Sequence, residues 1–197
     1  MHTDEGSPPT LWADGSPQNA SDWLLAVRAG EGDDEAFAVL VSRHTTPLLV
    51  LARHLLGNPE DAKDAVQETF LSAWRRLPEF RGDAAFRTWV YRICTNRCLN
   101  MLRHRTGALP LDTVQELTTA DAGAAPERAA ESSDAIAALI RALGKLSPDQ
   151  RACWVLRELH GLHYEEISQV VGASEQTVRG RLFRARCFLT KEMAPWR

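Results

Sequence analysis

Asp61-Ala-Lys-Asp-Ala-Val-Gln-Glu-Thr-Phe-Leu-Ser-Ala-Trp-Arg75 predicts a helix with two different faces. Asn58 suits the N-cap of this helix and Pro59 its first position. An apolar stripe with helical spacing consists of Ala62, Val66, Phe70, Ala73 and Leu77. The opposite face carries an exposed row made of Asp64, Gln67, Glu68 and Leu71. Such a row is most often solvated surface, but the segments that follow it favour a binding role.

The charges are segregated along the chain. The 197 residues carry a net charge of -3 and can form one sizeable core or two small ones. Residues 75–105 hold eight arginines against two acids, and residues 174–191 hold four arginines and a lysine against one glutamate. Acidic side chains predominate in residues 1–64 and 106–134. Two basic blocks around an acidic one are typical of a chain that contacts a polyanion twice, although solvated surface also has this pattern.

The apolar segments and the cysteines of the sequence indicate the cellular compartment and whether a metal or disulfide is expected. No window approaches the roughly 18 apolar residues of a membrane span, and residues 1–20 do not resemble a secretion signal. We therefore expect a cytoplasmic protein. Cys94 and Cys98 lie four apart and could form half of a zinc site, but no second ligand pair follows. With Cys153 and Cys187 they are too few for a disulfide framework, so we expect free thiols and no cofactor or metal.

Hydrophobic periodicity predicts an all-α fold with two small helical domains. We expect a disordered tail over residues 1–20, a helical domain over 21–106, an acidic flexible linker over 107–133 and a second helical domain over 134–194. Pro47 is expected to kink or split the helix that contains it. No run with strand periodicity is present.

Residues 163–186 have the form of a helix-turn-helix. Gly172 marks the turn and Ser174 caps the second helix. On the outer face of that helix, the candidate DNA contacts are Gln176, Thr177, Arg179, Gly180, Phe183 and Arg184. Glycine permits close approach, glutamine can pair with adenine, and arginine can bind guanine or phosphate. Arg181 and Arg186 lie nearer the packing side. A generic helical hairpin also has this form.

Residues 80–105 combine aromatic side chains, arginines and asparagines. A core helix with hydrated arginines explains this composition. A groove for single-stranded DNA explains it too, because unpaired bases stack on aromatic rings while arginines neutralise the backbone. Trp89 suits both interpretations.

Three segments in register resemble one family. They are residues 61–75, the stretch from Phe80-Arg-Gly to Arg103 with Phe86-Arg-Thr-Trp-Val-Tyr-Arg-Ile93, and the stretch from Tyr164-Glu-Glu-Ile to Arg186. Together they resemble the extracytoplasmic-function (ECF, group 4) sigma factors of bacterial RNA polymerase over residues 21–105 and 134–192. The resemblance implies a two-domain initiation factor of sigma regions 2 and 4 that binds core RNA polymerase and promoter DNA. It also implies silencing by an anti-sigma factor.

The resemblance also implies roles for individual residues. The row Asp64, Gln67, Glu68 and Leu71 would dock on the clamp helices of the largest polymerase subunit. The minus-ten element would be bound by Arg81, Asp83, Arg87, Asn96, Asn100 and Arg103. The minus-thirty-five element would be read by Gln176, Thr177, Arg179, Gly180, Phe183 and Arg184. Two positions depart from the family pattern: His163 replaces a serine or threonine cap, and Ala84-Ala85 replaces a pair that contains serine.

Two other classes of protein explain less of the chain. A free-standing helix-turn-helix regulator accounts for the carboxy-terminal half but leaves the exposed row and residues 80–105 without a role. An enzyme would need a nucleotide-binding glycine loop, a nucleophile elbow or a metal triad, and the sequence has none of these motifs. We therefore expect a protein without catalytic activity.

Overall fold

The computed structural model describes residues 17–108 and 128–196, and within these ranges it contains helices and turns but no strands. The helices are α1 (Asp22–Gly30), α2 (Asp34–Leu56), α3 (Pro59–Arg76), α4 (Phe86–Ala108), α5 (Arg128–Lys145), α6 (Pro148–Trp154), α7 (Tyr164–Val171) and α8 (Glu175–Glu192). Short 3-10 turns cover Pro17–Asn19, Leu77–Glu79 and Ala194–Trp196, and a π-helical turn covers Val155–Leu159. The predicted all-α class is confirmed.

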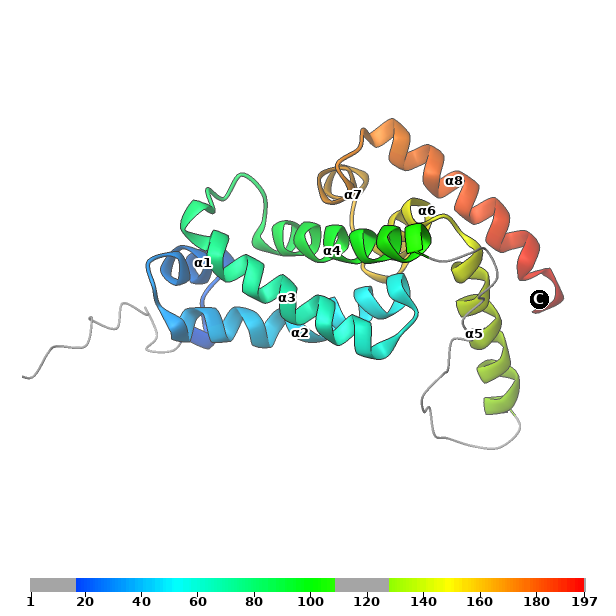
Figure 1. Ribbon diagram of the computed structural model, residues 1–197, viewed down its shortest axis with the longest axis horizontal. Helices are drawn as coiled ribbons and strands as arrows, with labels where there is room; N and C mark the ends of the chain where they lie inside the picture. The colour runs from blue at the N-terminus through cyan, green and yellow to red at the C-terminus, as the bar shows by residue number, and fades with distance from the viewer. Residues whose placement is uncertain (1–16, 109–127, 197) are drawn as a thin grey trace, which may run out of the picture.

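The first helical unit is formed by α1 to α4, with α2 and α3 lying side by side and α4 packed across them (Figure 1). Its core contains fully buried leucines of α1 and α2, such as Leu25, Leu40 and Leu51. Helix α3 begins as predicted: Asn58 Oδ1 accepts a hydrogen bond from Glu60 N at 2.8 Å, and Pro59 occupies the first position. Gly57 ends α2 in the left-handed conformation, with a φ of 73°.

Two local predictions need correction. Pro47 does not split helix α2, which continues through it, because one lost backbone hydrogen bond is outweighed by the burial of Leu48 and Leu51 on its core face. Helix α5 begins at Arg128, inside the range expected to be linker, where Ala129, Ala130 and Glu131 favour helix. Most of the expected tail (1–20) and linker (107–133) lies outside the described residues.

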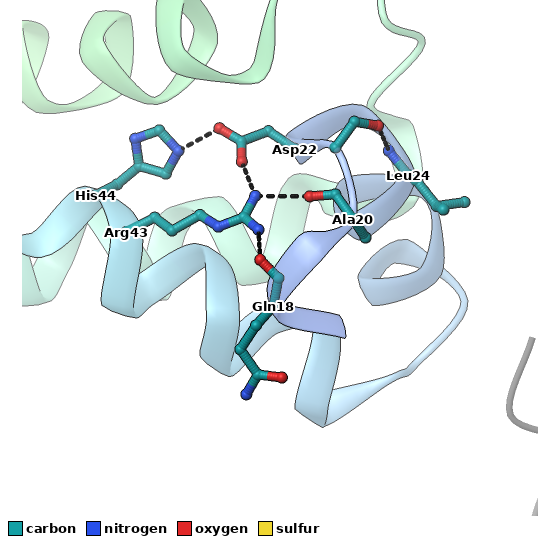
Figure 2. Close-up of polar contacts among 7 residues, drawn as sticks. Gln18, Ala20, Asp22, Leu24, Arg43 and His44 are labelled. Atoms are coloured by element: carbon teal, nitrogen blue, oxygen red, sulfur yellow. Dashed lines mark hydrogen bonds and ion pairs between the residues drawn. The ribbon is translucent and has the colours of Figure 1, made fainter. Parts of the chain in front are cut away.

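The start of α1 is fixed by a polar network around Asp22 (Figure 2). One carboxylate oxygen of Asp22 accepts a hydrogen bond from Arg43 Nη1, and the other contacts Nε2 of the buried His44, both at 2.7 Å. Arg43 also donates to the carbonyl oxygens of Ala20 and Gln18. Partial burial raises the pKa of Asp22, but the hydrogen bonds from Arg43 and His44 lower it more, so that it falls below its usual 3.8. The charged carboxylate is therefore the form that the fold stabilises.

We expect Asp22→Asn to lower the free energy of unfolding at pH 7 by about 1–3 kcal/mol, because two charge-assisted contacts are lost. In the parent protein this contribution is present above pH 3.8 and is lost as the pH falls through the lower folded-state pKa of Asp22. Urea unfolding at pH 7 measures the change. Asp64→Asn, on the exposed side of α3, is the control and should change the stability by less than about 0.5 kcal/mol. An equal, small effect of both substitutions would contradict the role of the network.

The second helical unit is formed by α5 to α8, with α6 and α7 packed on α8. It lies directly against the first unit, with α7 on α4 (Figure 1). Buried side chains of α6, α7 and the first half of α8 join the core of the first unit in one cluster, whereas α5 and the second half of α8 form a small separate cluster. Arg151 of α6 strengthens this contact by donating to the carbonyl oxygen of Leu55 at 2.7 Å and to that of Gly144 at 2.6 Å. The sequence predicted two helical units but not the contact between them.

Candidate nucleic-acid and polymerase interfaces

The predicted row on α3 is exposed to solvent. The side chains of Asp64, Gln67, Glu68 and Leu71 are all exposed, and Leu71 keeps 46% of its surface accessible. The opposite side of α3 is buried through Ala62, Val66 and Ala73, as the apolar stripe predicted. Two exposed carboxylates and an amide next to an exposed leucine form a surface that suits a basic helical partner.

A groove of about 650 Å³ lies between α3 and the outer side of α4. Its lining residues are Glu68, Thr69, Ser72, Arg76, Glu79, Trp89, Arg92, Ile93, Asn96, Arg97 and Asn100. The groove thus joins two predicted minus-ten contacts, Asn96 and Asn100, with Glu68 of the α3 row. Arg103, one turn farther along α4, donates to Asn100 Oδ1 at 3.0 Å.

Three arginines of this groove were not among the predicted DNA contacts: Arg76, Arg92 and Arg97. A signal for one of them was present, because Arg92, Asn96 and Asn100 recur every fourth residue and so share one side of a helix. Arg76 comes from another helix, and sequence spacing alone does not bring it to α4. With these cations the groove can hold a nucleic-acid backbone.

The loop between α3 and α4 rests on aromatic rings. The Phe80 ring lies 5.3 Å from that of Trp89 and 6.0 Å from that of Phe86, measured between centroids. Trp89 is half-buried among these rings and also lines the groove, so its position is compatible with both interpretations of the sequence. Arg81 and Asp83, the predicted loop contacts, are exposed.

Arg87 lies apart from the groove. Its Nη2 donates to the carbonyl oxygen of His160 at 2.6 Å, and its guanidinium lies 5.3 Å from the centre of the Tyr91 ring. The Tyr91 hydroxyl is 3.1 Å from His160 Nδ1. Burial and the nearby Arg87 lower the pKa of His160 to about 4, and burial raises that of Tyr91. In this arrangement Arg87 joins the two helical units rather than extending toward a ligand.

The outer face of α8 is open. Gln176, Thr177, Arg179 and Arg184 are exposed, and Phe183 keeps 69% of its surface accessible. A Cβ on Gly180 would lie 3.6 Å from the Arg184 guanidinium, an ordinary contact, so the protein itself does not require glycine there. On the packing side, Arg181 pairs with Asp149 at 2.9 Å and Arg186 with Glu158 at 2.7 Å. The division of arginines between the two sides of α8 therefore follows the predicted pattern.

The helix-turn-helix is capped at both of its helices. Ser174 Oγ accepts a hydrogen bond from Thr177 N at 3.2 Å, as the sequence indicated. At the start of α7 the His163 side chain forms no cap, and Glu166 Oε2 instead accepts from the His163 N–H at 2.7 Å. Gly172 takes the left-handed conformation between the helices, with a φ of 64°.

The cysteines are free thiols. Cys94, Cys98 and Cys153 are buried and Cys187 is exposed. Burial raises the pKa of Cys153 to about 11, and the hydrogen bond with Cys94, together with burial, raises the pKa of Cys98. Buried, protonated thiols are poor nucleophiles and poor metal ligands. The part of the chain that the structure describes holds no cluster of three potential metal ligands.

Comparison with known proteins identifies the family. Residues 40–107 match the model of sigma-70 region 2, and residues 136–189 match that of sigma-70 region 4. The chain is 36% identical to the RNA polymerase sigma-H factor of Pseudomonas aeruginosa, over 88% of this chain and 94% of that one. It is 34% identical to the ECF RNA polymerase sigma-E factor of Escherichia coli K12, over 90% and 97% respectively.

Solved structures agree with these matches. The structure of CnrH in complex with the cytosolic domain of CnrY aligns with a TM-score of 0.68 and 31% identity, and the alignment covers 89% of this chain and 99% of that one. A sigma factor from Bartonella quintana, solved with the anti-sigma factor NepR, shares the fold with a TM-score of 0.64, 23% identity and coverage of 80% and 96%. The chain therefore belongs to the sigma-70 family and, within it, to the ECF sigma factors of RNA polymerase. Among the described helices, none is long and apolar enough to cross a membrane.

The His160 contact makes the protein sensitive to moderate acid. The folded chain holds His160 neutral down to a pKa of about 4, whereas the unfolded chain binds a proton near 6.5. The contribution of neutral His160 to the free energy of unfolding is therefore fully present above pH 6.5 and is lost as the pH drops from 6.5 to about 4. Thermal unfolding at several pH values should show this slope, and His160→Gln should remove it. His104→Gln, at the exposed end of α4, is the control. An unchanged slope in His160→Gln would contradict the assignment.

Proposed function

We propose that this ECF sigma factor directs core polymerase to specific promoters and helps to open them, without catalytic activity of its own and in the cytoplasm where the polymerase works. The observation that carries the proposal is the presence of two different basic surfaces on one chain. The α3–α4 groove combines arginines and asparagines with Trp89, as single-stranded DNA requires. The outer face of α8 is an exposed helix that follows a capped turn, as major-groove binding requires.

Each helical unit has its own role in this proposal. In our proposal residues 21–106 form the unit that binds core polymerase and the minus-ten element, residues 107–133 act as an acidic linker, and residues 134–194 form the unit that reads the minus-thirty-five element. Residues 1–20 are a tail outside this scheme.

The first unit would bind the opened minus-ten strand. Asn96 and Asn100 lie on the exposed side of α4 and line the groove. Their amides can form hydrogen bonds with base edges, and Arg103 can bind the phosphates of the DNA backbone. Arg81 and Asp83 flank the glycine of the loop and are exposed for contact. Arg87 joins them only when it leaves His160.

The second unit would read duplex DNA at the minus-thirty-five element. Gln176 and Thr177 lie in the first turn of α8, where a recognition helix contacts base edges. Arg179 and Arg184 supply phosphate or guanine contacts, and Phe183 an apolar contact with a thymine methyl group. Gly180 lets the helix approach the groove closely.

The geometry of a promoter requires the units to separate. Elements about 25 base pairs apart are about 85 Å apart at 3.4 Å per base pair, whereas α8 is only about 27 Å long at 1.5 Å per residue. Helix α7, which precedes α8, packs directly on α4 in this structure. Binding to both elements must therefore break the α4–α7 contact, and the same step would release Arg87.

An anti-sigma factor is the proposed regulatory partner. Both solved structures described above contain a bound protein partner: CnrH is in complex with the cytosolic domain of CnrY, and the sigma factor of Bartonella quintana is in complex with the anti-sigma factor NepR. A partner that stabilised the packed arrangement of the two units, or covered the α3 row, would keep the protein from polymerase.

Run-off transcription with purified core polymerase on genomic fragments tests the proposed function. We expect initiation at discrete start sites, mapped by sequencing the 5′ ends, and weak binding of intact duplex by the protein alone. A free-standing helix-turn-helix regulator would give the opposite result: tight, specific binding of duplex DNA without polymerase and no initiation. That outcome would remove the proposal.

The α3 row has its own test. We expect Asp64→Lys with Glu68→Lys to weaken core-polymerase affinity at least about tenfold, because both carboxylates would then repel a basic partner. The fold should survive, since both side chains are exposed. Glu31→Lys with Glu165→Lys makes the same change in net charge elsewhere on the surface and should leave affinity intact. Unchanged affinity in the α3 variant, measured by biolayer interferometry, would refute the docking role.

A further inference from the structure

The proposed function assigns no contact to helix α1, yet this helix presents an unusual side chain. Trp23, in its first turn, keeps 57% of its surface accessible. The indole lies against the loop between α3 and α4. A Cβ built on Gly82 would be 2.8 Å from Trp23 Nε1 and 3.2 Å from Cδ1, so that only glycine lets the loop approach the ring this closely. The φ of 76° at Gly82 also favours glycine.

The position of Trp23 is fixed by its neighbours. Asp22, the preceding residue, is held by Arg43 and His44 of α2 (Figure 2). At the other end of α1, a Cβ on Gly30 would lie 2.9 Å from the carbonyl oxygen of Leu77, just before the loop. Helix α1 is thus anchored at both ends, and Trp23 has a fixed place beneath the loop.

The same network reaches the far end of the loop. The His44 ring, which contacts Asp22, also lies 5.2 Å from the ring of Phe86, the first residue of α4. The loop is therefore supported at Gly82 by Trp23 and at Phe86 by His44. Between these supports, Arg81 and Asp83 remain exposed.

A supporting role alone does not account for the exposed part of the Trp23 ring. The open aromatic ring lies against Gly82, and the residue before Gly82 in the loop is the exposed Arg81. An exposed ring with a cation on the neighbouring loop is a combination that suits an unpaired nucleotide, because the base can stack on the ring while a cation attracts the phosphate. We propose that Trp23 is a DNA-contact residue that stacks on an unpaired base of the opened promoter strand, next to the loop. This inference rests on the proposed minus-ten role of the first unit and adds α1 to that surface.

The experiment compares Trp23→Leu, which keeps the apolar bulk but not the aromatic ring, with Trp23→Phe, which keeps a ring. Each variant is assembled with core polymerase. The probe is a single-stranded oligonucleotide with the non-template sequence of the minus-ten region from a start site mapped with the parent protein. Trp196→Leu, at an exposed tryptophan near the carboxy terminus, is the matched control.

We expect Trp23→Leu to weaken oligonucleotide binding about 5- to 100-fold, the range for loss of one base–aromatic stack. Trp23→Phe and Trp196→Leu should stay within about threefold of the parent. The thermal midpoint and core-polymerase affinity should be the same for all four proteins, because the effect lies in the DNA contact and not in the fold.

Parent-like binding by Trp23→Leu would overturn the inference, and so would equal losses in Trp23→Leu and Trp23→Phe accompanied by a lower thermal midpoint. Either result leaves the proposed function standing, provided that the parent holoenzyme initiates transcription. Failure of the parent to initiate would instead refute the proposed function itself.

Discussion

Helix α4 packs against both helical units, and this double burial decides which of its polar side chains are available. Val90, Cys94 and Cys98 are buried on its inner side, while Tyr91 and Arg87 meet His160 of the second unit. The side that remains open carries Arg92, Asn96 and Asn100. An ordinary amphipathic helix has one buried side and one solvated side. Helix α4 instead uses one side for the core of the first unit and another for the second unit, and only its remaining side lines the groove.

The network around Asp22 links stability to the loop between α3 and α4. It fixes the first turn of α1 and, through His44, contacts the start of α4. Its energy comes from charge-assisted hydrogen bonds in a partly buried place, where such bonds are stronger than at the surface. The acid sensitivity of this network begins at a lower pH than that of the His160 contact, because a carboxylate and an imidazole titrate in different ranges. The start of α1 and the contact between the units therefore weaken in separate pH windows.

The sequence predicted what depends on local signals. The Asn58-Pro59 start of α3, the Gly172 turn after α7 and the Ser174 cap of α8 are set by residues within one turn of the feature, and the structure agrees with each. The exposed row on α3 and the open face of α8 follow from helical periodicity. These features need no knowledge of which elements touch.

Long-range contacts were not predictable in this way. Arg87 looked like a free cation because its partner, the carbonyl oxygen of His160, is 73 residues away. Arg76 enters the groove only because α3 packs beside α4, and Trp23 meets Gly82 only because α1 is anchored next to the loop. The π-helical turn at Val155–Leu159 has no sequence signal that we recognise. The packing of the helices decides which candidate residues share a surface, and the spacing of residues along the chain does not reveal this.

The central claim is that one chain holds its two DNA-binding units together when free and separates them on a promoter. Pulsed electron resonance between spin labels at position 53 on α2 and position 191 on α8 measures this distance directly. We predict one short distance in the free protein and an increase of several tens of Å in the complex with core polymerase and promoter, as the spacing of the two elements requires. An unchanged short distance in a complex that initiates transcription would contradict the account.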